Sequence, residues 1–574
     1  MTPEVNALVI RELSEAVKAG DPDAKVAGPA SCHTDIAWTS SMLAKGGAKG
    51  LDIITEHPYR QLPELPDYEP ELQTLQKVAD KYKPGFPVTA TEAGERSFSL
   101  FPDNNRIPGF ERQRVAYNTR MMLIGFGNGL QQYYHFTFTM DFEGCGWGFL
   151  LQGNPDNGRQ PMPAPIMFAC KNAADRLEDA APAGRVKLGF NYRCYIFDRG
   201  DKRVAALWKW NGKPTRTPLP AVLKNAAVYD VMGTEIKSGE IELNEFPVYL
   251  ETELSAAELA AAIRKTDLNA GTDLFDANAI VVAEREIKVR IFNLGTKPLA
   301  GTVETLGRKQ SFPAIAPEEF GEVSFRLPSP VSLKNNPVQA TVRTGSGAEK
   351  KFRWNLRAIL AAKAEKAPVI DGDLSDWNAQ AKEIPLALRT KLKPWTSAED
   401  AIRASARVMW DDAHLYLGVT VFKRDNVESP VGVSGLWLGD GIQFAFDPVR
   451  NALKEVKDYQ DDDFEYASAL VGGKPVIFRT KASAATYDSL EKEIGLLRDV
   501  PTAIRRYPDR TVYEFAFPRQ SVSPFRLEAG ASMRMNVLVN IGTQNGRAGF
   551  LQLTPGIGEN PKRPGLFMDL VLMP

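Results

Sequence analysis

The first 180 residues alternate short apolar runs with segments of helical period, and this alternation restricts the fold more than any other feature. An opening helix is predicted after Thr2, which can cap it, with Pro3 in its first turn. Alternation of this kind is typical of a parallel sheet with helical crossovers. Four strands are predicted at 25–29, 51–57, 86–92 and 130–138, with further helices at 36–48, 69–82, 109–124 and 164–177.

Beyond residue 183 the helical period gives way to alternating strands with polar turns. The predicted fold class is therefore multidomain, an α/β unit followed by all-β units. The predicted units are 1–183, a small β-sandwich at 184–254, an immunoglobulin-like β-sandwich at 255–357, a linker at 358–366 and a jelly-roll-like sandwich at 367–574.

Composition excludes several classes of protein. The 574 residues hold 70 Lys and Arg against 71 Asp and Glu, so no basic surface for nucleic acid is indicated. No apolar run approaches the roughly 20 residues of a membrane span, and the N-terminus lacks the pattern of a signal peptide. The four cysteines form no CxxC pair, so neither a zinc site nor a redox motif is supported.

A single carboxylate, Glu92, ends the third apolar run, directly before the turn at Ala93 and Gly94. Barrel enzymes keep their chemistry at the C-terminal ends of such strands. Retaining glycosidases need two carboxylates about 5 to 5.5 Å apart, and Glu92 is placed to be the nucleophile of such a pair. A carboxylate that only caps the next helix is the alternative.

His57 and Tyr59 follow the preceding strand in the sequence HPY. Both side chains would face the same mouth as Glu92, where they could hold its carboxylate or a sugar hydroxyl by hydrogen bonds. A histidine packed under a loop is the alternative interpretation.

The order of these segments resembles strands five to eight of the (β/α)8 barrels of clan A glycoside hydrolases, the group around families 39 and 5. The segments are KVAGPAS, LDIITEHPYR, VTATEAGE and QQYYHFTF, all within residues 1–180. The resemblance implies a partial TIM barrel with strands five to eight only, with Glu92 as nucleophile and His57 and Tyr59 in the substrate site.

The clan's acid/base glutamate lies at the end of strand four, and the first residues here resemble the helix that follows it. The chain is therefore expected to begin just after the acid/base and to be incomplete and inactive alone. Among substitutes, Glu56 should point away from His57 by strand alternation. The others, all weak candidates in loops, are Glu95, Asp141 and Glu143.

Trp147 stands among glycines in the loop after the fourth strand. An indole displayed there could stack on a sugar face. Packing into an inter-domain interface is the equal alternative.

The C-terminal 200 residues carry a second resemblance, to family-nine-like carbohydrate-binding modules. It rests on IDGDLSDW, VMWDDAHLYLGVTV, GDGIQFAFDP and YEFAFP. It implies a carbohydrate partner, with Trp395 and Trp437 as binding candidates because both lie in loop-like surroundings, whereas Trp377 and Trp410 are expected in the core.

Acidic residues 461–463 with Asp440 or Asp447 could hold calcium through oxygen ligands. A solvated acidic turn is the favoured interpretation, so no cofactor is expected, with a structural calcium ion as the alternative.

These observations predict a portion of a modular retaining glycoside hydrolase that acts on a polysaccharide or oligosaccharide. The main alternative is a non-catalytic carbohydrate-binding or scaffolding protein, because the acid/base half is absent. An unrelated α/β protein fused to adhesion-type sandwiches is a third. We expect the full-length parent to be extracellular or periplasmic; the sequence indicates neither the glycan nor the oligomeric state.

Overall fold

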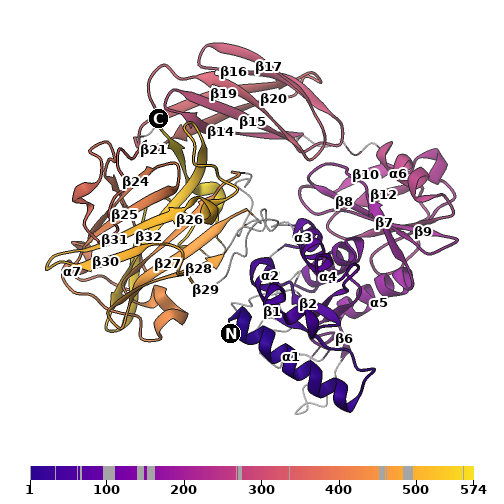
Figure 1. The fold of residues 1–574 in the computed structure, drawn as a ribbon. Helices are drawn as coiled ribbons and strands as arrows, with labels where there is room; N and C mark the ends of the chain where they lie inside the picture. The colour runs from indigo at the N-terminus through magenta and orange to yellow at the C-terminus, as the bar shows by residue number, and fades with distance from the viewer. Residues whose placement is uncertain are drawn as a thin grey trace.

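The computed structural model places four units along the chain (Figure 1). The N-terminal unit, in indigo, and the magenta unit lie at the lower right, the rose sandwich lies at the top, and the orange and yellow C-terminal unit lies at the left. The structure describes residues 2–32, 34–60, 62–64, 68–94, 110–138, 148–151, 162–266, 268, 274–334, 336–450, 459, 462–481, 495–559 and 562–574.

The N-terminal unit is built on four parallel strands in chain order, as the alternation predicts. They are β1 (Ala27–Cys32), β2 (Ile53–His57), β3 (Val88–Ala93) and β4 (Tyr133–His135). The helical elements are α1 (Pro3–Gly20), α2 (Ile36–Ala44), η1 (Gly47–Lys49), α3 (Tyr68–Asp80), α4 (Phe110–Gly127) and α5 (Pro165–Leu177), and a small hairpin pairs β5 (Leu150–Leu151) with β6 (Met162–Pro163). Four consecutive parallel strands bring their carboxyl ends to one edge of the unit.

Helix α1 carries two different apolar faces. Thr2 caps it, and its buried face contains Ala7 and Ile10. Val5, Leu8, Val9 and Leu13 also recur with helical spacing, but they lie on the other face and are 46–53% exposed. Among the described strands, β1 and β4 each pair on one side only. This unit thus presents an uncovered apolar stripe and two open sheet edges.

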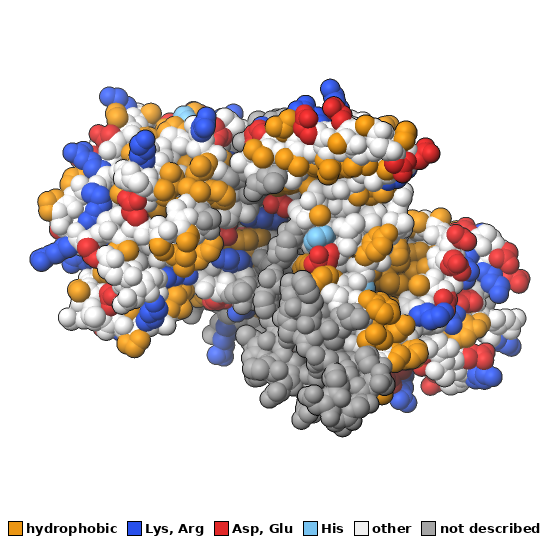
Figure 2. Space-filling view, turned by 90° about the horizontal axis from the view of Figure 1, so that it is seen from below, with side chains coloured by type: hydrophobic (Ala, Val, Ile, Leu, Met, Phe, Trp, Pro, Cys, Tyr) orange, Lys and Arg blue, Asp and Glu red, His pale blue; other side chains and the backbone are white. Residues whose placement is uncertain are grey.

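The view from below shows hydrophobic side chains at the surface (Figure 2). They gather in patches on both halves of this view, including the right-hand half, where the first two units lie. Lys and Arg are interspersed with Asp and Glu over the coloured surface. No described helix is long and apolar enough to cross a membrane.

The second unit is a five-stranded antiparallel sheet in the order β11-β13-β9-β8-β7, with a two-stranded sheet of β10 and β12. One face of the larger sheet packs on the N-terminal unit, where Trp208 is buried and donates through Nε1 to Glu64 across 2.7 Å. The strands are β7 (Ala181–Arg185), β8 (Tyr192–Asp198), β9 (Arg203–Lys209), β10 (Thr215–Pro218), β11 (Ala227–Tyr229), β12 (Glu240–Leu243) and β13 (Val248–Thr252), with η4 at Ala221–Leu223.

Helix α6 (Ala256–Arg264) belongs to the core of this second unit, although the sequence places residue 255 at the start of the next one. Ser255 and Glu258 form a capping box that starts the helix. Leu259 and Ile263 are then buried in the core of the second unit, where α6 packs against β8.

The third unit is a two-sheet sandwich, in agreement with its period-two pattern. One sheet has the order β14-β15-β18 and the other β17-β16-β19-β20, with a shared apolar core between them. The strands are β14 (Phe275–Ala283), β15 (Glu286–Asn293), β16 (Leu299–Thr305), β17 (Arg308–Ile315), β18 (Phe320–Arg326), β19 (Asn336–Thr344) and β20 (Glu349–Leu356).

The C-terminal unit folds its strands around one large core rich in phenylalanine. Strand β21 (Ala358–Lys363) joins the two halves, because it pairs in parallel with both β34 and β24. The interpretation of 358–366 as a linker is therefore wrong for residues 358–363. Ala358, Ile359 and Ala361 are buried, so this Ala-rich segment is a core strand.

The remaining elements of this unit are mostly antiparallel strands. They are β22 (Ile384–Pro385), β23 (Leu388–Lys391), β24 (Arg403–Trp410), β25 (His414–Phe422), β26 (Gly441–Asp447), β27 (Phe464–Val471), β28 (Lys474–Lys481), β29 (Gly495–Leu496), β30 (Thr502–Arg506), β31 (Thr511–Pro518), β32 (Ser532–Thr543), β33 (Gly546–Gln552) and β34 (Met568–Leu572). Short helices are α7 (Ser397–Asp400), η5 (Leu374–Asp376), η6 (Gly432–Leu438), η7 (Arg519–Val522) and η8 (Pro564–Leu566).

Candidate active site

Glu92 lies at the carboxyl end of β3 and is held by two side chains that follow the neighbouring strand. The Oη of Tyr59 donates to Oε1 of Glu92 across 2.5 Å. The Nδ1 of His57 lies 3.6 Å from Oε2. The structure thus brings together the three residues that the sequence predicts at this mouth.

The register of the two parallel strands explains this meeting. Glu56 pairs with Ala90, which places the end of β2 beside Thr91 and Glu92. The Nε2 of His57 lies 3.2 Å from Oγ1 of Thr91, so both ring nitrogens of the histidine face β3. Thr91 is a positioning residue that the sequence reasoning missed, because strand alternation would turn the neighbour of Glu92 to the opposite face of the sheet.

The site is open on one side and supported on the other. The Glu92 side chain is 31% exposed, whereas the ring of Tyr59 is buried. The carboxylate is therefore fixed in orientation yet reachable from solvent. Such a group can attack an electrophilic carbon or hydrogen-bond a ligand hydroxyl.

Glu56 turns away from this mouth, as strand alternation predicts. It is buried, accepting from Oγ1 of Thr34 across 2.6 Å and from Oη of Tyr68 across 3.0 Å. Burial raises the pKa of Glu56 to about 7. Glu56 thus helps to hold β2 against its neighbours and is not a catalytic partner for Glu92.

Arg60 completes the support under HPY, and the sequence reasoning missed it too. Its guanidinium donates to Glu71 across 2.6 Å and lies over the ring of Tyr68. The Oη of Tyr117 donates to the carbonyl oxygen of Arg60 across 2.5 Å. Helices α3 and α4 thereby fix the segment that carries His57 and Tyr59.

Strand β4 continues the carboxyl edge of the sheet on the far side of Glu92. Ala93 of β3 pairs with His135 of β4, whose ring stacks on Phe149 with centroids 4.2 Å apart. Trp147, the predicted sugar-stacking residue, lies outside the described residues, as do Glu95, Asp141 and Glu143.

The two predicted tryptophans of the C-terminal unit differ in their surroundings. Trp395 donates through Nε1 to the carbonyl of Ala548 across 3.0 Å and packs partly against the main core. Lys391 lies over its ring at 5.1 Å. Trp437, in η6, is 41% exposed. Of the two, Trp437 offers the freer aromatic surface.

The motif IDGDLSDW builds structure. The Nε1 of Trp377 donates to Glu514 across 2.8 Å, and the backbone amides of Asp371 and Gly372 donate to the same carboxylate. Trp410 is buried, as expected. The motif thus anchors the first loop of the unit to β31.

Three acidic residues of this unit, Asp447, Asp462 and Asp463, meet with ligand atoms within 4.8 Å of one another. All three are buried, so the interpretation as a solvated acidic turn is wrong for the described Asp462 and Asp463. Asp440 lies apart, where it pairs with Lys423, and residue 461 lies outside the described residues.

The chemistry of this cluster suits a hard cation, since carboxylate oxygens are calcium ligands. Burial and the neighbouring Asp462 raise the pKa of Asp447 to about 7. A guanidinium nitrogen of Arg534 lies 3.7 Å from Oδ2 of Asp447 and supplies positive charge to the cluster. The negative charge of the three carboxylates can therefore be neutralised in two ways. Either a bound cation does so, or a proton on Asp447 does so together with the guanidinium of Arg534.

No protein-family model matches the chain, and no curated protein matches it. Among solved structures, it is similar to a carbohydrate-binding module of family 9 from Caldicellulosiruptor kristjanssonii in complex with cellotriose. The identity is 18% and the TM-score 0.30, over 38% of this chain and 94% of that one.

It is also similar to a β-porphyranase of glycoside hydrolase family 86 from the human gut bacterium Bacteroides plebeius. There the identity is 11% and the TM-score 0.34, over 61% of this chain and 74% of that one. A third similar structure is a family 30 endoxylanase from Clostridium papyrosolvens. There the identity is 9% and the TM-score 0.29, over 44% of this chain and 61% of that one. These likenesses are remote.

Proposed function

We propose that the chain is a portion of a modular retaining glycoside hydrolase that acts on a polysaccharide or oligosaccharide. Glu92 is the nucleophile, and the C-terminal unit binds carbohydrate. The observation that carries the proposal is the contact of Glu92 with Tyr59 and His57 at the carboxyl ends of adjacent parallel strands. The parent acts outside the cytoplasm, where polymeric glycans are found.

In the proposed reaction a carboxylate oxygen of Glu92 attacks the anomeric carbon while the glycosidic C–O bond breaks. The departing oxygen takes a proton from a second carboxyl group, and water then hydrolyses the glycosyl ester of Glu92. Tyr59 and His57 hold the Glu92 carboxylate in the attacking orientation. No pre-attack reorientation is then needed.

The second carboxyl group comes from outside the described part of the sheet unit. There Glu56 is bonded to Thr34 and Tyr68, and other glutamates are engaged in the same way. These are Glu64 with Trp208, Glu71 with Arg60 and Glu111 with Arg114. None of these four carboxylates is available to face Glu92.

The open edges of the sheet support a larger barrel. Strands β1 and β4 each have one unpaired side among the described strands, and α1 exposes its stripe of Val5, Leu8, Val9 and Leu13. In our proposal β1–β4 are strands five to eight of a (β/α)8 barrel. The remaining strands close both edges, cover α1 and supply the acid/base.

Covalent labelling tests the nucleophile without requiring the acid/base. A 2,4-dinitrophenyl 2-deoxy-2-fluoro-β-glycoside has a leaving group that departs without a proton, and its glycosyl ester is slow to hydrolyse. We expect an adduct on Glu92 in the full chain and none in Glu92→Gln. Glu15→Gln, at an exposed glutamate of α1, is the matched control. Adducts spread over surface carboxylates in every variant would contradict the proposal.

A non-catalytic carbohydrate-binding protein is the second candidate, favoured by the engagement of those four neighbouring glutamates. On either view, this chain alone should turn over aryl β-glycosides negligibly. Retention on an insoluble polysaccharide without labelling of Glu92 would select the second candidate. Labelling of Glu92 would select the first.

A further inference from the structure

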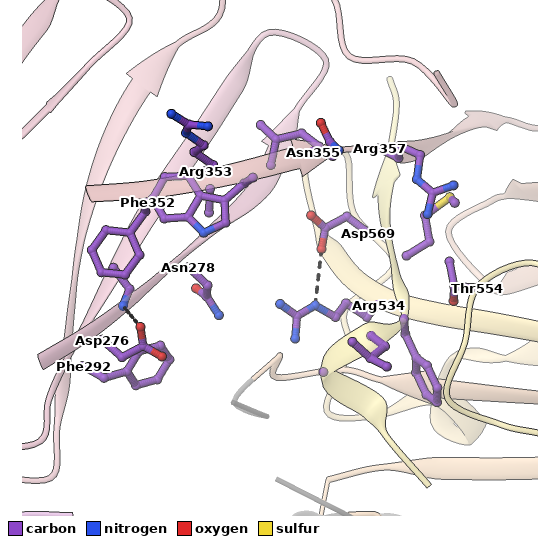
Figure 3. A pocket seen from close by; sticks show the side chains of 18 of the residues that line it. Asp276, Asn278, Phe292, Phe352, Arg353, Asn355, Arg357, Arg534, Thr554 and Asp569 are labelled. Carbon is purple, nitrogen blue, oxygen red and sulfur yellow. Dashed lines mark hydrogen bonds and ion pairs between the residues drawn. The ribbon is translucent and has the colours of Figure 1, made fainter. Parts of the chain in front are cut away.

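A cavity of about 500 Å³ lies between the third unit and the C-terminal unit (Figure 3). Strands β14 and β20 form one wall, and β32, β34 and the segment before β34 form the other. Its volume falls in the range of small-molecule sites. It is far along the chain from Glu92 and contains neither Trp395 nor Trp437.

Three oxygen atoms of this cavity are buried without a hydrogen-bond partner among the described residues. They are Oδ1 of Asn278, Oγ1 of Thr554 and Oδ1 of Asp569. In Figure 3 these side chains come from both walls. Buried polar atoms in folded proteins are nearly always paired with protein groups or ordered water, so these three oxygens are places where a donating group can bind.

The neighbours of Asp569 hold its Oδ1 in place. Its Oδ2 accepts from the backbone amide of Val281 across 2.8 Å. Its Oδ1 lies 3.7 Å from Nε of Arg534, which is an ion-pair distance beyond hydrogen-bond length. A hydroxyl group could therefore bind Oδ1 directly while the carboxylate stays fixed by β14.

Aromatic rings line the wall formed by β20. Phe352 and Trp354 alternate with exposed residues along the strand, so they share one face. Their rings are stacked, with centroids 5.5 Å apart and planes 9° apart, and both remain partly accessible. Such rings can pack against the C–H face of a pyranose.

The two walls are tied together before any ligand arrives. Arg290 of β15 donates to the carbonyl of Arg450 across 2.6 Å, and Arg450 donates to the carbonyl of Val281 across 3.1 Å. Rigid walls reduce the ordering cost of binding. The cavity is thus a pre-formed site rather than a seam that must close.

We propose that this cavity binds a short neutral saccharide. A sugar ring supplies hydroxyl donors for Asn278, Thr554 and Asp569 together with an apolar face for Trp354. A phosphate or sulfate ion could pair with Arg534, but it would lack donors for Asn278 Oδ1 and Asp569 Oδ1 and would be repelled by Asp276 and Asp569. The site takes its ligand class from the proposed carbohydrate function but does not depend on Glu92.

Calorimetric titration of the full chain with cellotriose, xylotriose and mannotriose tests the proposal. We expect at least one to bind, and Asn278→Ala or Thr554→Val to weaken that binding about tenfold. Thr554→Val keeps the side-chain shape, and melting curves identify any variant that fails to fold. The exposed Lys309→Ala on β17 is the control.

Further arms separate this site from the others. Trp437→Ala and Glu92→Gln should leave the Asn278-dependent binding unchanged. If Glu92 is never labelled but this binding is present, only the catalytic proposal fails. Absence of saccharide binding, binding indifferent to Asn278 and Thr554, or binding of sulfated saccharides alone would overturn the saccharide site.

Discussion

Tyr59 and Glu92, 33 residues apart, are joined by a hydrogen bond of 2.5 Å at the ends of β2 and β3. The Tyr59 phenol is buried and the Glu92 side chain is partly exposed, so the hydrogen bond orients a carboxylate that solvent can reach. Strands β2 and β3 are parallel neighbours, and both side chains therefore lie at the same carboxyl edge of the sheet.

Replacing Tyr59 by phenylalanine should misorient Glu92 while leaving the fold in place. We expect labelling of Glu92 by the fluoro-glycoside to slow at least tenfold, because the carboxylate loses its fixed orientation. Stability should fall by only about 1 kcal/mol, the usual value of one hydrogen bond. Labelling rates and urea denaturation measure the two effects. Tyr82→Phe, on an exposed tyrosine, should change neither.

Glu56 should make the sheet unit less stable as pH rises. Burial raises its pKa from 4.5 to about 7, so between these values the folded form keeps a proton that the unfolded form releases. The part of the free energy of unfolding that depends on protonated Glu56 is fully present below about pH 4.5. It is lost as the pH rises through 7, and it totals about 3 kcal/mol.

Hydrogen exchange of the β1–β3 amides at pH 5 and pH 8, corrected for the intrinsic pH dependence of exchange, reports on the opening of the sheet that contains Glu56. Glu56→Gln should flatten the difference because the amide has no titration. An unchanged pH dependence in that variant would assign the effect to another group. Glu15→Gln should behave like the wild type.

Glu514 should be a stability residue of the C-terminal unit. It accepts hydrogen bonds from Trp377, Asp371 and Gly372. Glu514→Ala leaves these donors without their partner, and we expect a loss of about 3 kcal/mol. Calorimetric melting of the full chain measures it, with the exposed Glu528→Ala as reference. Equal melting of the two variants would show that the motif does not anchor the loop.

The apolar stripe of α1 should promote self-association of the isolated chain. Leu8 and Leu13 are about half exposed, and β1 has an unpaired side among the described strands. We expect the sedimentation coefficient to rise with concentration, and the double variant Leu8→Lys and Leu13→Lys to lower that rise. A wild-type chain that stays monomeric at every concentration would show that the exposed apolar residues of α1 do not promote self-association.

The parts of this structure that the sequence predicts are those with a periodic signal. Alternating runs predict the parallel sheet, and strand ends predict that His57, Tyr59 and Glu92 meet. Period two predicts the third-unit sandwich. Each inference uses neighbours in a regular element, where spacing alone determines position.

Tertiary context decides the rest. Spacing identifies α1 as a helix but does not show that Ala7 and Ile10, rather than Leu8 and Leu13, face the core. Residues 358–366 resemble a linker because Ala, Lys and Glu are frequent there, yet residues 358–363 pair between two strands. The cavity at Asn278 and Asp569 unites segments almost 300 residues apart, for which no local pattern exists.

Peptide mass mapping after treatment with the fluoro-glycoside shows directly whether Glu92 is a glycosidase nucleophile. We expect one glycosyl adduct per chain, on the peptide that contains Glu92, lost in Glu92→Gln and slowed in Tyr59→Phe. An adduct confined to another carboxylate, with Glu92 unmodified, would contradict it.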